Sequence, residues 1–259
     1  MTDKIQVKDA TLNAHVVGEG PPIVCLHGLG MDMSIFGDLI KYFSNHKIIR
    51  FDLRGQGQST VPEGPYTMGG LIADTEAVID YYEVHDEVVF DLSIGGMIAQ
   101  GLALKRLNQV RGLVLCATAA KFGQANQWHV RAATARTKGM VALVDEKLER
   151  WNVKYSGVQT RKLNRAQFIS ANPEGYAASC EAIAGSNFYT PTSSLRLATL
   201  GLGGDLDKST PPDQVRETTD LIRGSKFQLI HGAGHLAPET HANVVAVHLH
   251  EFFLQIGHI

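Results

Sequence analysis

The segment VVFDLSIGG, residues 88–96, decides the fold of this chain. A short apolar run ends here at a serine, and two glycines follow it closely. Such a run predicts a buried strand, and the segment after Ser93 has the pattern of a helix. A sharp turn between the two would lift the Ser93 hydroxyl above the sheet, so Ser93 is the candidate nucleophile. The turn would also place the main-chain N–H of Ile94 at a helix N-terminus, where negative charge is favoured.

Asp91 stands two residues before Ser93, a place that glycine usually occupies in a turn of this kind. An ionised carboxylate about 7 Å from a developing oxyanion would repel it by about 2.4 kcal/mol at an effective dielectric of about 20, roughly fifty-fold in rate. Burial would raise the pKa of Asp91 and reduce that penalty. We therefore predict that Asp91 modulates the turn and takes no part in the chemistry.

Strand and helix patterns alternate on both sides of this segment. Apolar runs typical of strands buried on both faces occupy residues 21–28, 47–53, 87–92 and 110–118. Helical spacing of apolar residues marks 31–43 and 71–82. The alternation predicts an α/β fold with a mostly parallel, doubly wound sheet.

The alternation stops after residue 120. Residues 121–190 are richer in helix formers and charge, which predicts a helical cap between two parts of a core, 1–120 and 191–259. The core is predicted to resume with a glycine-rich strand at 195–204 and a helix capped by Ser or Thr at 209–222. A second strand at 226–231 and a closing amphipathic helix at 244–256 follow.

Composition limits the classes of function. The chain has 259 residues and a formal net charge of −2, without the clustered basic excess of a nucleic-acid-binding protein. No apolar run is long enough for a membrane span, and residues 1–10 lack the pattern of a signal peptide. Three cysteines without a CxxC pair predict free thiols, a cytoplasmic location and no metal site. Oligomeric state leaves no signal in the sequence.

Three further features follow predicted strands. The turn LHGLG, residues 26–30, would direct the main-chain N–H of Leu29 at an oxyanion. Asp207 lies just past a strand and is the candidate acid, whereas Asp205 is expected to hold its loop. His235 follows a strand and a glycine-rich turn, so it is the candidate base. The ends of parallel strands meet at one edge of a sheet, which would bring these groups together.

With these motifs the chain resembles the α/β hydrolases over nearly its whole length, and among them the 3-oxoadipate enol-lactonases and related esterases. The resemblance is carried by LHGLG, FDLRGQGQS, LSIGGMIAQGLAL, GDLDKSTPPDQVRETTDLI and GAGHL, together with GMVALVDEKLERW and EGYAASCEAI in the cap. It implies a serine hydrolase of small-molecule esters or lactones that needs no cofactor, with Ser93, Asp207 and His235 as triad and Leu29 and Ile94 as oxyanion donors.

The resemblance also implies an anionic substrate, as in aromatic catabolism, for which Trp128 and Arg131 are the candidate binding residues in the cap. Besides Asp91, the chain departs from the family where Gln56 replaces a histidine and where His241 replaces a common proline. An aspartate nucleophile, as in haloalkane dehalogenases, is disfavoured because Ser93 holds the apex of the turn. Three alternatives stay open: a perhydrolase, a C–C bond hydrolase, and a ligand-binding or weakly active protein with a turn impaired by Asp91.

Overall fold

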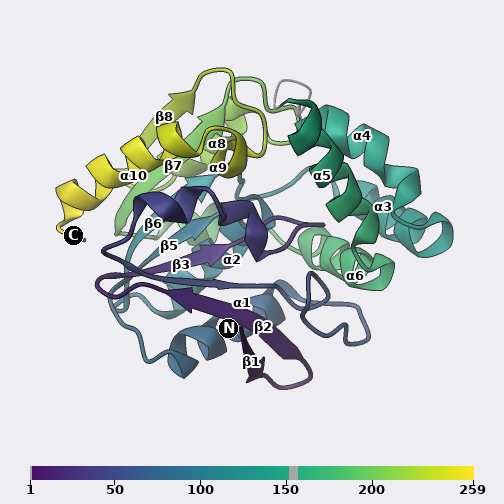
Figure 1. Ribbon diagram of the computed structural model, residues 1–259, viewed down its shortest axis with the longest axis horizontal. Helices are drawn as coiled ribbons and strands as arrows, with labels where there is room; N and C mark the ends of the chain where they lie inside the picture. The colour runs from purple at the N-terminus through teal and green to yellow at the C-terminus, as the bar shows by residue number, and fades with distance from the viewer. Residues whose placement is uncertain (1, 152–156) are drawn as a thin grey trace.

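A single mixed sheet organises the protein. The computed structural model describes residues 2–151 and 157–259. Within these ranges eight strands lie in the order β1-β2-β4-β3-β5-β6-β7-β8, and Figure 1 shows them at the centre of the molecule. The strands are β1 (Asp3–Gln6), β2 (Thr11–Val17), β3 (Pro22–Leu26), β4 (Lys47–Phe51), β5 (Glu87–Asp91), β6 (Val110–Cys116), β7 (Ala198–Gly204) and β8 (Lys226–Ile230). Strands β3 to β8 are parallel, whereas β2 pairs antiparallel with both β1 and β4.

Helices cover both faces of the sheet, as a doubly wound fold requires. The helices of the core are α1 (Met68–Tyr81), α2 (Ile94–Lys105), α7 (Tyr189–Ser193), α8 (Pro212–Asp220), α9 (Ala237–Thr240) and α10 (Ala242–Ile256). Phe252 of α10 packs over Gly112 of β6, whereas Thr219 of α8 packs over Gly201 of β7. Because the register of β6 and β7 puts these two glycines on opposite faces, α8 and α10 lie on opposite sides of the sheet.

The glycines of β7 let helix α8 approach the sheet closely. A Cβ atom on Gly201 would lie 2.0 Å from the Thr219 hydroxyl, and one on Gly204 would lie 2.4 Å from the Ala233 carbonyl. The strand predicted at 195–204 is present as β7, and its glycines are required because a helix and a loop pack directly on its backbone.

Four helices gather beyond one end of the sheet, on the right of Figure 1. They are α3 (Ala125–Lys138), α4 (Val141–Trp151), α5 (Val158–Ser170) and α6 (Pro173–Ala184), and all fall within 121–190. Arg136 of α3 joins Glu174 and Glu181 of α6 through bonds of 2.5–2.7 Å. We call this group the helical cap.

Two expectations about local structure were wrong. The predicted helix over 31–43 is two 3-10 helices, η1 (Met33–Phe36) and η2 (Leu39–Tyr42), because Gly37 and Asp38 interrupt it and Asp52 accepts the Met33 N–H. The helix after Asp207 has Pro211, not Ser or Thr, at its N-cap. The N–H groups of Ser209 and Thr210 bond instead to the Asp207 carboxylate. The antiparallel pair β1–β2 was not predicted at all.

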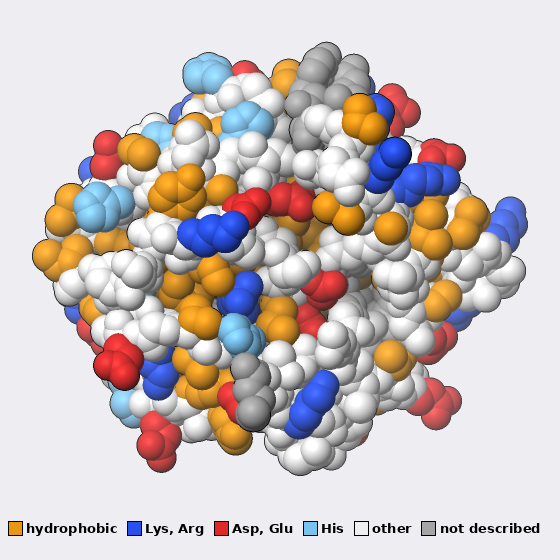
Figure 2. All heavy atoms as spheres, viewed as in Figure 1, with side chains coloured by type: hydrophobic (Ala, Val, Ile, Leu, Met, Phe, Trp, Pro, Cys, Tyr) orange, Lys and Arg blue, Asp and Glu red, His pale blue; other side chains and the backbone are white. Residues whose placement is uncertain are grey.

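The face drawn in Figure 2 carries acidic and basic side chains interspersed, with no extended basic area. Among the described residues, no helix is both long and apolar enough to cross a bilayer. Cys25, Cys116 and Cys180 are buried free thiols.

Candidate active site

Ser93 sits on a strained turn between β5 and α2. Its φ of 59° and ψ of −117° are unusual for a residue with a side chain, and such strain clusters at functional sites. The turn is tight because a Cβ on Gly95 would lie 2.3 Å from the Leu26 carbonyl, and one on Gly96 would lie 2.3 Å from the Thr118 hydroxyl. The two glycines after Ser93 therefore allow the helix to begin close against the sheet, even with aspartate at position 91.

Asp91 is wholly buried at the end of β5. Its Oδ1 accepts the main-chain N–H of Cys116 at 3.2 Å, and its Oδ2 has no partner among the described residues. Burial raises the pKa of Asp91 well above its ordinary value, and the bond from Cys116 only partly opposes this. Because burial favours the neutral acid, it reduces the repulsion that an ionised carboxylate would exert on an oxyanion.

Asp207 and His235 form a buried pair. Nδ1 of His235 lies 2.8 Å from Oδ2 of Asp207, and both side chains are almost fully buried. Oδ1 of Asp207 accepts two further bonds, from the N–H groups of Ser209 and Thr210, at 2.7 and 3.0 Å. The carboxylate can only accept, so Nδ1 carries the proton and Nε2 is left with a free lone pair. The pair therefore has the arrangement of a general base held by an acid.

Asp205 has a different set of partners from Asp207. Its carboxylate accepts the N–H of Gly232 at 2.8 Å and lies 3.1 Å from Nδ1 of His231. Asp205 thus ties the end of β7 to the loop that carries His235, as expected for the structural acid of the two.

The Ser93 hydroxyl makes no hydrogen bond within the described residues, so a bond to His235 is not formed in this structure. Catalytic hydrogen bonds are often long without substrate and tighten when it binds. Main-chain bonds nevertheless link the loops: Ser93 donates to Cys116, and Ala117 donates to Leu202 of β7. The ends of β5, β6 and β7 are therefore held in one connected edge.

The main-chain N–H groups of Leu29 and Ile94 donate no hydrogen bond within the described residues, although both residues are buried. The Leu29 loop is held from both sides. Oε1 of Gln56 accepts the N–H of Gly30 at 2.6 Å, and His27 bonds to the Gly28 carbonyl at 2.9 Å. Two unpaired donors on fixed backbone are what an oxyanion site needs.

His27 is a structural histidine. Its Nε2 accepts the Leu53 N–H at 2.9 Å, so Nδ1 carries the proton that is donated to Gly28. Burial lowers the pKa of His27, which favours the neutral ring.

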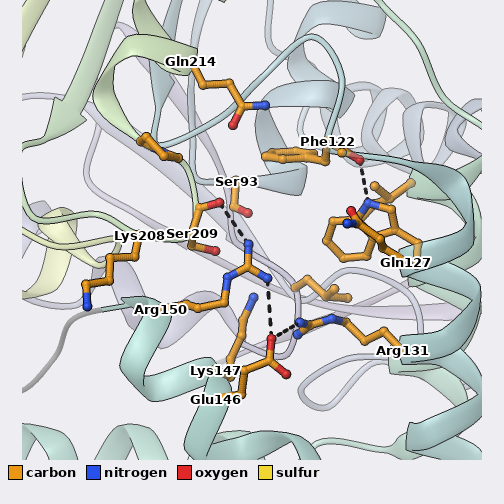
Figure 3. A pocket seen from close by; sticks show the side chains of 15 residues that line it. Ser93, Phe122, Gln127, Arg131, Glu146, Lys147, Arg150, Lys208, Ser209 and Gln214 are labelled. Atoms are coloured by element: carbon orange, nitrogen blue, oxygen red, sulfur yellow. Dashed lines mark hydrogen bonds and ion pairs between the residues drawn. The ribbon is translucent and has the colours of Figure 1, made fainter.

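A cavity of about 670 Å³ opens beside Ser93, under the helical cap. Its described lining residues are Leu29, Ser93, Phe122, Gly123, Gln127, Trp128, Arg131, Glu146, Lys147, Arg150, Ile183, Lys208, Ser209, Pro211 and Gln214. Four of these side chains are cationic and one is a carboxylate, so the wall carries an excess of positive charge. Figure 3 shows Arg131 of α3 and Lys147 and Arg150 of α4 extending into the cavity beside Ser93.

Trp128 and Arg131 line this cavity, but both are already engaged. Nε1 of Trp128 donates to the Phe122 carbonyl at 2.6 Å. Arg131 pairs with Glu146 at 2.7 Å and lies 3.4 Å from the Tyr176 hydroxyl. Figure 3 shows Arg131 and Glu146 joined on one wall.

Lys147 is a cavity residue that the sequence analysis missed. It lies on the buried face of α4 with Leu143, Val144 and Trp151. A lysine at an apolar position of an amphipathic helix is the feature of the sequence that could have indicated it. Its Nζ lies 5.1 Å from the Trp151 ring centre, a contact worth about 0.5–2 kcal/mol. Burying an unpaired ammonium costs several kcal/mol, so the aromatic ring alone does not compensate.

The last turn of α4 contacts the loops that carry Asp207 and His235. The carbonyls of Arg150 and Trp151 accept the N–H groups of Lys208 and His235, each at 3.0 Å. The cap helix thereby contacts the residue after Asp207 and the candidate base itself.

Comparisons of sequence and structure show which known proteins this chain resembles. A sequence model described as the alpha/beta hydrolase fold matches residues 21–134. The solved enol-lactonase of Burkholderia xenovorans LB400 superposes with a TM-score of 0.90 at 29% identity, covering 95% of this chain and 97% of that one. The chain has the α/β-hydrolase fold.

Two further proteins are similar to this chain over most of its length. The 3-oxoadipate enol-lactonase 2 of Acinetobacter baylyi (strain ATCC 33305 / BD413 / ADP1) is 29% identical over 218 residues, with 80% of each chain covered. A thermophilic esterase from Thermogutta terrifontis, solved with malate bound, superposes over 100% of both chains with a TM-score of 0.93 at 25% identity.

Proposed function

We propose that this chain is an α/β hydrolase that cleaves a carboxylic ester or lactone through an acyl-enzyme. The observation that carries the proposal is Ser93 on its strained turn, at the wall of a cavity and next to two unpaired N–H donors. The enol-lactonase and esterase names of the relatives support the same class of bond.

In this mechanism Ser93 Oγ attacks the carbonyl carbon while Nε2 of His235 takes its proton. The N–H groups of Leu29 and Ile94 hold the oxyanion that forms, and a single donor of this kind is typically worth about 10²–10³ in rate. Asp207 keeps the imidazole in the required tautomer and stabilises the imidazolium.

His235 then returns the proton to the leaving oxygen, and the acyl group stays on Ser93. In an ester this releases the alcohol, whereas in a lactone the hydroxyl stays attached to the acyl chain. Water, activated by His235, hydrolyses the acyl-enzyme to the acid and regenerates Ser93. No step requires a metal or an organic cofactor.

The test is hydrolysis of 4-nitrophenyl acetate by the natural protein, Ser93→Ala and Asp91→Gly. We expect turnover by the natural protein and its loss in Ser93→Ala. Unchanged turnover in Ser93→Ala would exclude Ser93 as nucleophile. A panel of enol-lactones, homoserine lactones and short esters then identifies the preferred substrate.

The second candidate is a ligand-binding protein on a hydrolase scaffold, which the presence of Asp91 favours. An inactive natural protein whose turnover appears in Asp91→Gly would support it. The buried position of Asp91 and its bond to Cys116 argue for the active hydrolase instead.

A further inference from the structure

Lys147 is a buried cation aimed into the cavity. Only 4% of the residue is exposed, although it belongs to the wall that faces Ser93. Figure 3 shows its side chain rising from α4 with the nitrogen pointing into the space below Ser93. The position is therefore on the substrate side of the cap and not on its outer surface.

The ammonium of Lys147 has no hydrogen bond and no ion pair in the part of the chain that the structure describes. The other cations of the wall differ in this respect. Arg131 pairs with Glu146 at 2.7 Å, and Arg150 lies 3.4 Å from the Ser209 carbonyl and 3.7 Å from Glu146. Lys208 is largely exposed and lies 3.8 Å from Glu149. Of these four side chains, Lys147 alone is buried and has no hydrogen bond or ion pair within the described residues, although it contacts the Trp151 ring.

A buried lysine of this kind is costly for the empty protein. Burial lowers the pKa of Lys147 to about 7, with a further contribution from Arg131 and Arg150. A purely structural role for the stem would be met by methionine without that cost, because the volume is similar and no charge is buried. The energetic deficit is removed when an anion enters the cavity beside Nζ.

We propose that Lys147 is a specificity-determining residue that binds an anionic group, most simply a carboxylate, on the acyl part of the substrate. The assignment rests on the proposed function for the position of the reacting carbonyl at Ser93. It replaces Arg131 as the binding cation, since Glu146 already neutralises Arg131. Lys147 holds the substrate and takes no part in bond cleavage.

The test compares two esters of similar length, mono-4-nitrophenyl succinate, which is anionic, and 4-nitrophenyl butyrate, which is neutral. In Lys147→Met we expect kcat/KM for the anionic ester to fall about 10- to 100-fold, mainly through KM, because a charged hydrogen bond to substrate is lost. The neutral ester should change by less than about threefold. The control is Lys162→Met, an exposed lysine of the cap helix α5, which should alter neither ester.

An equal loss for both esters, or no loss for either, would overturn the assignment. Lys147→Met should fold at least as well as the natural protein because it removes a buried charge, and a thermal melt checks this. Lys147→Gln serves as a second neutral variant if the melt shows a defect.

A binding measurement separates this proposal from the proposed function. Calorimetric titration of Ser93→Ala with glutarate measures the affinity of the cavity for a carboxylate without turnover. The double variant Ser93→Ala/Lys147→Met should bind glutarate about 10-fold or more weakly than Ser93→Ala. Unchanged glutarate binding counts against Lys147, whereas failure of the natural protein to hydrolyse any ester counts against the hydrolase.

Discussion

The main-chain carbonyl of Trp151, the last residue of cap helix α4, accepts the N–H of His235 at 3.0 Å. The indole of Trp151 also lies nearly parallel to the imidazole, at 12° and 6.3 Å between ring centres. The cap therefore forms one wall of the candidate base, in addition to covering the cavity.

Trp151→Ala is expected to lower both stability and turnover. Loss of the buried ring should cost about 3–5 kcal/mol of unfolding free energy, and a less constrained imidazole should lower kcat about 10-fold or more. Trp151→Phe keeps an aromatic wall and should retain most of the activity. Urea unfolding and the kcat for 4-nitrophenyl acetate measure both effects. A folded Trp151→Ala with the natural kcat would show that the indole does not position His235.

Replacement of Asp207 is expected to remove most of the activity while the fold persists. Asp207→Asn should lower kcat by about 10⁴, because the amide favours the wrong tautomer of His235. The matched control is Asp205→Asn, in the same loop, which should stay within about fivefold because Asp205 bonds to Gly232 and His231 instead. If the two variants lose activity equally, Asp207 is not the acid of the triad.

Asp91 should influence stability more than catalysis. The unfolded chain loses the Asp91 proton above about pH 4, whereas burial holds it in the folded protein. The protonated Asp91 contributes fully to the free energy of unfolding below about pH 4. This contribution is lost as the pH rises through the pKa that Asp91 has in the folded protein, which is the higher of its two pKa values.

Asn does not titrate, so the stability of Asp91→Asn relative to the natural protein should increase between about pH 5 and about pH 8. Urea unfolding of both proteins at the two pH values measures this difference. At pH 7 the variant should keep kcat within about threefold, since a neutral acid and an amide are similar in shape. A constant stability difference would mean that Asp91 is ionised in the folded protein.

Gln56 is expected to act on catalysis through the Leu29 loop. Its Oε1 accepts the Gly30 N–H at 2.6 Å, whereas its Nε2 has no partner among the described residues. Gln56→Ala frees the loop and should lower kcat about 10-fold with little change in KM. Gln58→Ala, an exposed glutamine two residues away, is the control and should be neutral. A change confined to KM would contradict a role in oxyanion binding.

The preference for an anionic ester should depend on pH. Burial is the main reason why the pKa of Lys147 is lowered to about 7. Among the neighbouring groups, Arg131 and Arg150 also lower this pKa, whereas Cys180 and Asp207 raise it. Because a lysine loses its charge above its pKa, the ratio of kcat/KM for the anionic ester to that for the neutral ester should fall above about pH 7. Groups that act on both esters cancel in this ratio. Lys147→Met should give a low, flat ratio, and an unchanged profile in that variant would exclude Lys147 as the titrating group.

Much of the core could be predicted because its signals are local. The strand runs, the turn at Ser93 and the closing helix α10 depend on short stretches of apolar spacing and glycine. The proximity of Asp207 and His235 followed from their places after parallel strands, and the structure puts them 2.8 Å apart. Their catalytic roles stay predictions.

The errors arose where distant residues decide the local structure. Ser209 and Thr210 do not cap α8, because the helix begins later, with Pro211 at the N-cap, and the Asp207 carboxylate holds the N–H groups of both residues in the preceding loop. Arg131 lines the cavity and stays a predicted binding residue, but its pairing with Glu146, fifteen positions away, has no signal in the sequence.

The sequence by itself determined the α/β class, the order of the candidate triad and the glycines that make the turn after Ser93, because each depends on neighbouring residues or strand ends. Only the tertiary structure decided that Asp91 and Lys147 are buried. Burial changes the energy of a charge without leaving a mark on the residue type. The same letter in the sequence can stand for a solvated charge, a neutral acid or an unpaired cation, and packing decides which one it is.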